Sequence, residues 1–371
     1  MNGLKFFSLV LTALLLCSCN GSGGNSDDSS ASDTPENQSD IIELLVFGRK
    51  AYVLQFDKRT LKFNEAVEVS DDSVGSYGIL DSQNRIYAAT AGVTSNKWVE
   101  NEFLQISHQR GIGDNNGYIS LSKNEDKLAV SSFATGNISL FSIDKESGAI
   151  KDDSVVISRS IESRAHWVQW GPSGNNIYAI YHGEGKITRH SYDVQKGQVD
   201  LISNVVFQED SGAATRLRHM AFHPGKPNFV YIVAEGSNEI IFTEVSELNG
   251  QFIERQRIST LPSSFTDNNT AAHIQISKDG NNLYVSNRGH DSIAVFNIDA
   301  NGELSLIEHE TANINRPRFF LLLDDEKLLF TANQRGGSIV ATSVGLAGEL
   351  DILDVSSDVV LNGSRFIAKL P

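Results

Sequence analysis

The chain has 371 residues, a formal net charge of −15 at pH 7, and only two cysteines, Cys17 and Cys19. The charge argues against a nucleic-acid partner and against an anionic membrane surface, because both require clustered basic residues. The positions of the cysteines exclude a disulfide, a thiol nucleophile and a zinc–thiolate site from the chain beyond residue 19.

Residues 1–18 have the composition of a bacterial secretory signal peptide. Lys5 gives a positive start, and the apolar run 6–16 is too short to span a bilayer as a finished helix. The run ends in LCSC at 16–19, which resembles a lipobox with Cys19 as the acylated residue. Two or three acyl chains would anchor Cys19 stably in a lipid bilayer. The alternative is an ordinary signal peptide with incidental cysteines.

Residues 19–40 are predicted to be the lipidated Cys19 followed by a flexible tether. From residue 20 onward this segment has no large apolar residue, so it cannot bury enough surface to fold. As a flexible coil it would span about 25 Å. Asn20 is not the aspartate that marks inner-membrane retention in enteric bacteria. We therefore expect an exported lipoprotein anchored in the outer membrane and facing the periplasm.

A repeat runs through residues 41–371. Its clearest copy is YVSNRGHDSIAVFNID at 284–299, which predicts a strand, a tight turn and a second strand. A further strand precedes each copy, as in HMAFHPGKPN at 219–228. A copy lies near Phe47, and others start at residues 87, 129, 178, 231 and 330 with spacings of roughly 42 to 53 residues. This period predicts an all-β, seven-bladed β-propeller, with the tail 352–368 completing the first blade.

Polar residues recur at two places in four consecutive predicted blades: the start of the innermost strand and the end of the second strand. Antiparallel pairing brings these two places to the same rim. The residues are His166, Tyr181 and His182 in blade four, Arg218, His219 and Glu235 in blade five, His273 and Arg288 in blade six, and Arg318 and Gln334 in blade seven. Because these polar residues come from blades four to seven, they predict a binding site on that side of one mouth of the channel. Any one of the histidines also fits a turn-capping role.

The stretches RHMAFHP, YVSNRGHDSIAVF and NRPRFF resemble the repeat signatures of the lactonase family of seven-bladed propellers. That family includes bacterial 6-phosphogluconolactonase and fungal carboxymuconate-lactonising enzyme. The resemblance extends from Ile42 to the C-terminus and is strongest over 218–333. It implies a catalytic cluster of His166, Arg218, Glu235 and Arg288. We expect His219, His273, Arg318 and Tyr181 to bind the substrate.

Three positions depart from the family pattern. Tyr181-His182-Gly183 replaces the usual Asp-Leu-Gly at the end of the second strand of blade four, and His273 occupies a slot that is usually Glu. Blade three has Ser131-Ser132 where the family has an asparagine. These differences bear on the substrate contacts on that side of the mouth.

Hydrolysis of a lactone needs a water activated by a base and donors for the developing oxyanion. Glu235 or His166 is the candidate base, and Arg218 and Arg288 are candidates to hold the oxyanion and the product carboxylate. The same groups suit the reverse cyclisation. A periplasm-facing protein would not meet the cytosolic phosphorylated sugar lactone, so we expect another small-molecule lactone or carboxylate.

The alternative function is a non-catalytic propeller that binds an envelope protein or a cell-wall component. No GxSxG, HExxH or Walker motif is present. The rim also lacks the several Asp, Glu and Asn residues with which calcium-dependent propeller lactonases hold their ion. The sequence therefore predicts neither a metal nor an organic cofactor.

Overall fold

The computed structural model describes residues 40–70, 75–99, 102–110, 116–193, 196–209, 212, 214–246, 248–356, 361 and 363–371. The chain divides into two units, Met1–Gln38 and Ser39–Pro371. The predicted signal peptide, the acylated Cys19 and the tether as far as residue 39 lie outside the described residues. Within the described residues, no helix is long and apolar enough to cross a membrane.

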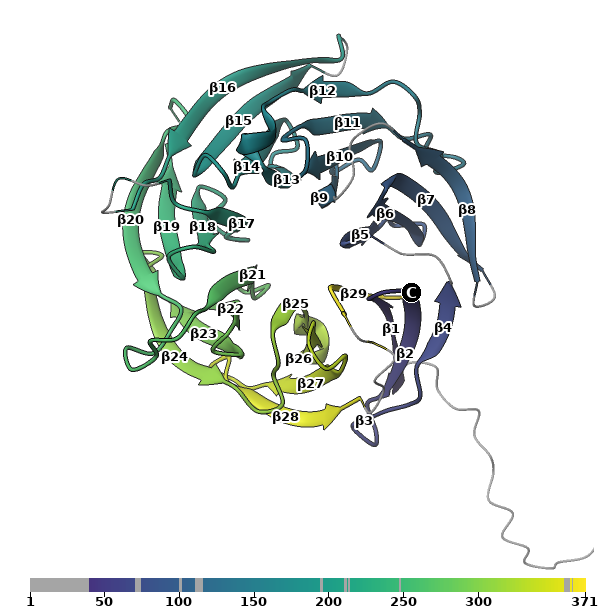
Figure 1. Cartoon of the computed structure of the whole chain (residues 1–371), viewed down its shortest axis with the longest axis vertical. Helices are drawn as coiled ribbons and strands as arrows, with labels where there is room; N and C mark the ends of the chain where they lie inside the picture. Colours follow the sequence, from purple (N-terminus) through teal and green to yellow (C-terminus); the bar gives the residue numbers. More distant parts are fainter. Residues whose placement is uncertain are drawn as a thin grey trace, which may run out of the picture. The chain divides into compact units, whose positions relative to one another are not determined.

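The described strands form seven antiparallel sheets, the blades of a propeller, around a common centre (Figure 1). Blade two contains β5 (Tyr77–Leu80), β6 (Arg85–Thr90), β7 (Gly92–Val99) and β8 (Glu102–Gln109). Blade three contains β9 (Asn116–Leu121), β10 (Lys127–Ser132), β11 (Ile138–Ser142) and β12 (Val155–Ile157). Blade four contains β13 (Ala165–Trp170), β14 (Asn176–Tyr181), β15 (Lys186–Asp193) and β16 (Gln198–Val206), preceded by the 3-10 turn Ile161–Ser163.

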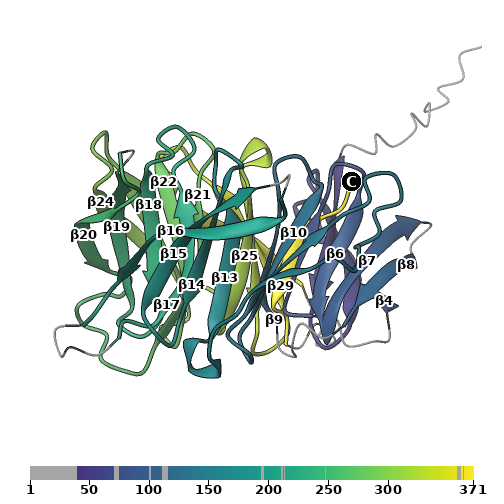
Figure 2. The same cartoon turned by 90° about the horizontal axis from the view of Figure 1, so that it is seen from above.

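The next three blades repeat this order. Blade five contains β17 (Leu217–Phe222), β18 (Phe229–Ala234), β19 (Glu239–Val245) and β20 (Phe252–Ser259). Blade six contains β21 (Thr270–Ile276), β22 (Asn282–Arg288), β23 (Ser292–Ile298) and β24 (Leu304–Glu310). Blade seven contains β25 (Pro317–Leu323), the 3-10 turn Asp324–Glu326, β26 (Leu328–Asn333), β27 (Ile339–Val344) and β28 (Leu350–Val355). Seen from its edge, the ring has strands running between its two faces (Figure 2).

Blade one joins the two ends of the ring. It contains β29 (Phe366–Lys369), β1 (Ile41–Phe47) and β2 (Ala51–Asp57), and both β3 (Lys62–Phe63) and β4 (Val67–Ser70) pair with β2. The predicted closure by the tail is correct only for its last residues. Ile352 belongs to β28 and completes blade seven, whereas β29 pairs with β1 as the innermost strand of blade one. The closure removes a free edge that would otherwise expose unpaired backbone groups.

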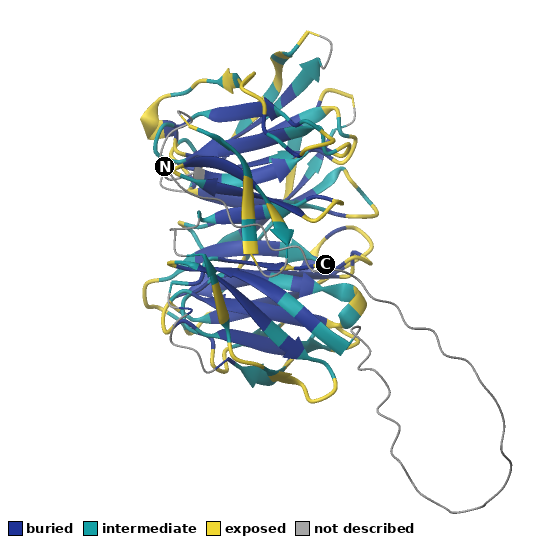
Figure 3. Cartoon of the chain, turned by 90° about the vertical axis from the view of Figure 1, so that its right-hand side faces the viewer, coloured by how far each residue is buried: buried dark blue, intermediate teal, exposed yellow. Residues whose placement is uncertain are grey.

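Burial follows the position of a strand within its blade (Figure 3). Every residue of the second strand β22 is buried, because it is covered on both faces by neighbouring blades. The outermost strand β16 contains only exposed and half-buried residues. The middle of each second strand is therefore apolar, which is why the sequence showed these strands best.

Tyrosines of the second strands connect adjacent blades. The hydroxyl of Tyr231 in blade five donates to the carbonyl of Gly302 in blade six at 2.8 Å. The hydroxyl of Tyr284 in blade six donates to the carbonyl of Gly348 in blade seven at 3.0 Å. Both glycines lie in the turn between the third and fourth strands of the following blade. The repeated tyrosine of the sequence motif is therefore an inter-blade contact.

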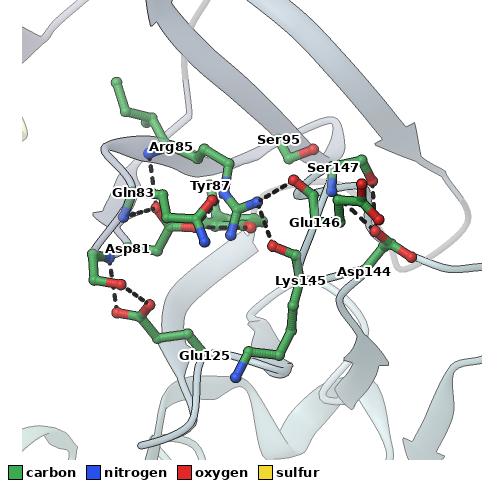
Figure 4. A network of polar contacts seen from close by, with 12 residues as sticks. Asp81, Gln83, Arg85, Tyr87, Ser95, Glu125, Asp144, Lys145, Glu146 and Ser147 are labelled. Carbon is green, nitrogen blue, oxygen red and sulfur yellow. Dashed lines mark hydrogen bonds and ion pairs between the residues drawn. The ribbon is translucent and has the colours of Figure 1, made fainter.

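A buried ion pair connects blades two and three (Figure 4). The Arg85 guanidinium binds the carboxylate of Asp81, and the side chains of the two residues are 5% and 0% exposed. Arg85 also donates to the carbonyl of Lys145 at 3.0 Å, in the hairpin of blade three. Tyr87 donates to the same carboxylate at 3.3 Å, and burial followed by the charge of Asp81 raises the pKa of its hydroxyl.

We expect Arg85→Met to lower the free energy of unfolding by about 3–5 kcal/mol, because it leaves the Asp81 carboxylate buried without a counter-charge. Urea denaturation measures the effect. Arg255→Met is the matched control, since Arg255 and Glu244 form a half-exposed pair 2.6 Å apart whose loss should cost at most about 1 kcal/mol. Equal losses in the two variants would contradict the expectation.

Candidate active site

A cavity of about 380 Å³ occupies one mouth of the channel. Every blade contributes to its lining, which consists of Ser76, Gly117, Phe133, His166, His182, Arg218, Glu235, Arg288, Arg318, Gln334 and Arg365. The structure thus brings together the four predicted catalytic residues and Arg318. Chain segments from all parts of the ring are needed to form this cavity.

In blades four, five and seven, a β-bulge at the start of the innermost strand directs one side chain into the cavity. In blade four, Ala165 pairs with Tyr181 and Trp167 with Ile180, so His166 is the extra, unpaired residue. Arg218 and Arg318 occupy the same bulge position in blades five and seven. A bulge turns the extra side chain away from the regular alternation of a strand. The repeated irregularity explains why side chains from separate blades converge on one point.

Gly117 is the bulge residue of blade three. A Cβ atom at this position would lie 2.7 Å from the carbonyl oxygen of His166. Only glycine therefore allows β9 to approach β13 this closely at the cavity. Gly117 is itself part of the cavity lining, together with Phe133 of the same blade.

Glu235 is the one carboxylate among the described residues of the cavity lining, and cationic and imidazole groups surround it. Arg288 Nη2 donates to Glu235 Oε1 at 2.7 Å. The Oε2 atom lies 3.3 Å from Arg218 Nε and 3.5 Å from His182 Nε2. Burial favours the protonated carboxyl, but the His182 contact and the charges of Arg218 and Arg288 outweigh it and hold the pKa of Glu235 well below its usual range. Glu235 is therefore ionised, and each of its carboxylate oxygens lies close to at least one guanidinium group.

His166 is buried and neutral. Burial, reinforced by the nearby charge of Arg218, lowers the pKa of its imidazole well below the usual value. Its Nδ1 atom has no hydrogen-bond partner among the described residues. The ring edge contacts Phe133, with the ring centroids 5.6 Å apart. The cavity therefore contains an unprotonated imidazole, which is the state that a general base requires.

Four arginines line the cavity against one glutamate. Arg218 is fully buried, whereas Arg288 contacts Glu235 from nearer the opening. Burial and the charge of Arg218 lower the pKa of Arg288 to about 10, so it remains charged at neutral pH. The buried Nε atoms of Arg318 and Arg365 have no hydrogen-bond partner among the described residues. The cavity carries an excess of positive charge, with donors available for an anionic ligand.

A layer of aromatic rings crosses the channel beneath the cavity; we call it the aromatic floor. Each blade supplies one residue from its innermost strand: Phe366, Tyr77, Tyr118, Trp167, His219, His273 and Phe319, in blade order. Neighbouring rings are in contact, with centroid separations from 4.2 Å for His273–Phe319 to 6.1 Å for Tyr77–Phe319. His219 and His273, predicted to bind substrate, are therefore in the floor and not in the lining.

Tyr181 also lies away from the cavity. Its ring is fully buried between blades three and four, and the Arg159 guanidinium lies 4.8 Å from its centroid. The side chain of Tyr181 pairs across the sheet opposite Ala165, on the regular side of the bulge. The next residue, His182, reaches the cavity instead.

The turn that follows β22 fixes Arg288. Asn287 Nδ2 donates to the carbonyl of Thr260 at 2.8 Å, and the Thr260 hydroxyl donates to Asn287 Oδ1 at 2.7 Å. Gly289 has a φ of +143°, and a Cβ atom there would lie 2.1 Å from the carbonyl oxygen of Asn268. In the Asn-Arg-Gly motif, the Asn287 amide is hydrogen-bonded in the interior and Arg288 lines the cavity. Gly289 has a backbone conformation and a close contact that only glycine allows.

Arg365 is the charged residue of the cavity lining that sequence reasoning missed. It immediately precedes β29, and it is followed by Phe366 just as Arg318 is followed by Phe319. The Arg-Phe pair in SRFI therefore repeats the pair in PRFF. Alignment of the tail with the start of blade seven, rather than with the end of a blade, would have identified this residue.

A larger hollow of about 570 Å³ lies between blades one and two. Among the described residues its lining includes His108 and Arg110 but no carboxylate, unlike the lining at the channel mouth. Among the described residues, no group of three or more His, Cys, Asp and Glu is placed to hold a metal ion. The described lining of the candidate site contains imidazoles, guanidinium groups and the carboxylate of Glu235.

We expect the fold to lose stability as the pH falls below 6.5. His166, His219 and His273 are buried with pKa values lowered by burial, so they are neutral when folded. In the unfolded chain they take up protons near pH 6.5, and stability present above that pH is lost as the pH falls toward their folded pKa values. The slope approaches about 1.4 kcal/mol per pH unit for each histidine. Urea midpoints at pH 7.5 and 5.5 measure it, and equal midpoints would refute it.

A comparison with protein-family models identifies the relatives of this propeller. Residues 47–358 match the family described as lactonase, 7-bladed β-propeller. The chain belongs to the lactonase family of seven-bladed β-propellers. The relationship suggested by RHMAFHP, YVSNRGHDSIAVF and NRPRFF is thereby confirmed.

Named relatives of this lactonase-family propeller are distant. It is 29% identical over 248 residues to the 6-phosphogluconolactonase of Bacillus subtilis (strain 168), covering 64% of this chain and 69% of that protein. It is 29% identical over 316 residues to an uncharacterized protein of Staphylococcus aureus (strain USA300), covering 82% and 85%.

Two solved structures share its fold. The periplasmic gluconolactonase of Pseudomonas aeruginosa superimposes with a TM-score of 0.77 at 20% identity, over 89% of this chain and 99% of that chain. A Lactobacillus plantarum protein superimposes with a TM-score of 0.79 at 22% identity, over 89% and 100%. At these identities the superpositions establish the fold alone.

Proposed function

We propose that the protein hydrolyses an anionic lactone, or closes one in the reverse direction, in the cavity at the channel mouth. The observation that carries the proposal is a neutral imidazole, His166, that faces a cavity with an excess of guanidinium groups. Family membership supports it, as do the names of two relatives, a 6-phosphogluconolactonase and a periplasmic gluconolactonase.

His166 is the better of the two candidate bases. Glu235 has Arg288 on one oxygen and Arg218 and His182 near the other, whereas His166 Nδ1 has no hydrogen-bond partner among the described residues. A carboxylate so engaged has little tendency to take a proton. Glu235 instead holds the guanidinium groups in place, while His166 accepts the proton of the attacking water.

In the hydrolytic direction the water oxygen bonds to the lactone carbonyl carbon as His166 takes a water proton. Arg288 and Arg318 stabilise the oxyanion of the tetrahedral intermediate. The bond between the carbonyl carbon and the ring oxygen then breaks, and His166 returns the proton to the departing alkoxide. The product is a hydroxy acid whose carboxylate suits the same guanidinium groups.

A panel of lactones tests the proposal. Sugar and aromatic lactones, each with and without a phosphate or carboxylate substituent, are incubated with the full chain, and ring opening is followed by acid release. We expect turnover of charged members and a loss of at least about 100-fold in kcat/KM in Arg288→Ala. Silence across the panel would reject the lactonase in favour of a binding propeller. Turnover at equal rates in Arg288→Ala and the unaltered chain would remove Arg288 from the mechanism.

The envelope location is part of the proposal and rests on the LCSC motif and the polar segment that follows it. Diacylglycerol on Cys19 would hold the propeller at a bilayer, with the outer membrane facing the periplasm as the expected site. Incorporation of labelled palmitate by the intact chain, and its loss in Cys19→Ser, is the expected result. An unlabelled chain would refute the anchor and leave the chemistry of the cavity untouched.

A further inference from the structure

Two imidazoles of the aromatic floor contact each other directly. His219 Nδ1 lies 3.1 Å from His273 Nδ1. The other ring nitrogen of His219, Nε2, lies 3.3 Å from Arg218 Nη1 and 3.3 Å from the hydroxyl of Tyr77. His219 and His273 are only 1% and 4% exposed, so these contacts are shielded from solvent.

The contacts determine which nitrogen carries each proton. A guanidinium can only donate, so His219 Nε2 must accept and is unprotonated. The ring proton of His219 is therefore on Nδ1, from which it donates to His273 Nδ1. His273 must then carry its own proton on Nε2. That atom is buried and has no partner among the described residues, as expected of the end of the chain of contacts.

The guanidinium of Arg218 is held in place by contacts with the aromatic floor and with the backbone of blade six. Its Nη1 donates to the carbonyl of Ala272 at 2.7 Å, and its Nη2 donates to the hydroxyl of Tyr77 at 3.1 Å. Its Nε lies 3.3 Å from Glu235 Oε2. A planar guanidinium with acceptors on both Nη atoms cannot rotate its Nε edge away from Glu235 without breaking them.

We propose that Tyr77, His219 and His273 are positioning residues that set the plane of Arg218 and, through it, the carboxylate of Glu235. His273 acts on Arg218 indirectly, through His219. It keeps the proton of His219 on Nδ1, so that His219 Nε2 can accept from Arg218. If the proton moved to Nε2, an N–H would face the guanidinium and the contact would become repulsive. This inference deepens the proposed function and rests on it for its catalytic consequence.

The ¹⁵N shifts of the imidazoles test the proton positions without any substrate. The full chain is labelled with ¹⁵N-histidine, and the resonances of His219 and His273 are assigned by their loss in His219→Asn and His273→Asn. We expect His219 to be protonated on Nδ1 and His273 on Nε2. Protonation of His219 on Nε2 in the unaltered chain would overturn the proposal.

Two nearly isosteric substitutions separate hydrogen bonding from packing. His273→Asn keeps an acceptor, Oδ1, near the position of Nδ1, whereas His273→Leu has the same branching and no acceptor. Both lose the stacking of His273 on Phe319, whose ring centroid is 4.2 Å away. We expect the His219 proton to stay on Nδ1 in His273→Asn and to shift toward Nε2 in His273→Leu. The same tautomer in both variants would overturn the role of His273.

Once a lactone substrate is known, turnover measurements test the catalytic consequence of the proposal. We expect His273→Leu to lower kcat by about 10- to 100-fold with little change in KM, because it misplaces groups that act on the reacting atoms. His273→Asn should recover most of the loss, and Tyr77→Phe should lower kcat in the same direction. Equal kcat values in His273→Leu and His273→Asn would contradict the proposal. A chain with the expected tautomers and no turnover would instead refute the lactonase.

Discussion

Replacing His166 by asparagine is expected to lower kcat for the lactone substrate by about 10²–10⁴-fold, the range typical of a lost general base. The amide fills part of the space of the imidazole but cannot take a proton from water. KM should change little, because Arg288, Arg318 and Arg365 all remain in the cavity lining. Steady-state kinetics at pH 7.5 measures the effect.

His223→Asn is the matched control for this substitution. His223 lies in a turn, where its Nδ1 accepts from the backbone N–H groups of Gly225 and Lys226 at 3.1 Å, and asparagine can accept both. Its kcat should equal that of the unaltered chain. The pH profile gives an independent check, because burial and Arg218 lower the pKa of His166 and the acid limb must fall below pH 6.5. A kcat in His166→Asn within threefold of the unaltered chain would remove His166 as the base.

Glu235→Gln is expected to have two opposite effects. Turnover and stability both fall, because Arg218 and Arg288 lose their counter-charge inside the protein; the loss of stability should be about 3–5 kcal/mol. Affinity for an anion rises, since a ligand carboxylate or phosphate can take the place of Glu235. The melting temperature with and without 6-phosphogluconate, the acid that a 6-phosphogluconolactonase releases, measures both effects.

Glu239→Gln provides the comparison in the same blade. Glu239 lies 3.5 Å from Arg257 and is partly exposed, so its loss should cost at most about 1 kcal/mol. We expect it to leave the anion response unchanged. A weaker stabilisation of Glu235→Gln by the anion than of the unaltered chain would show that Glu235 contacts the ligand favourably, contrary to the role assigned to it.

The blades were predictable because, in blades two to seven, each buried second strand has an apolar middle, with an aromatic residue or alanine as its third residue, and is followed by a turn. Pairing that strand with the one before it also placed His166, Glu235 and Arg288 at a common rim. This prediction needs only the antiparallel geometry of a hairpin. It holds even where the blades share few identical residues.

The sequence did not show the bulges, which place some side chains elsewhere than expected. A register shift of one residue decides whether a side chain points into the cavity or into the layer beneath it. Arg218 and His219 are neighbours in the chain, yet Arg218 lines the cavity and His219 belongs to the aromatic floor. Tyr181 and His182 are also neighbours in the chain, yet His182 lines the cavity and Tyr181 packs between blades three and four. Propensity and periodicity carry no information about such a shift.

The ring is closed by β29, which pairs Leu44 with Lys369 and directly follows Arg365. Closure of the ring and completion of the cavity are therefore one event. A ligand that contacts Arg365 binds the closed ring more tightly than a ring whose last strand has detached, so it stabilises closure by mass action. Binding of such an anion and closure of the ring would then be thermodynamically linked, with the ligand stabilising the contact between the first and last strands of the propeller.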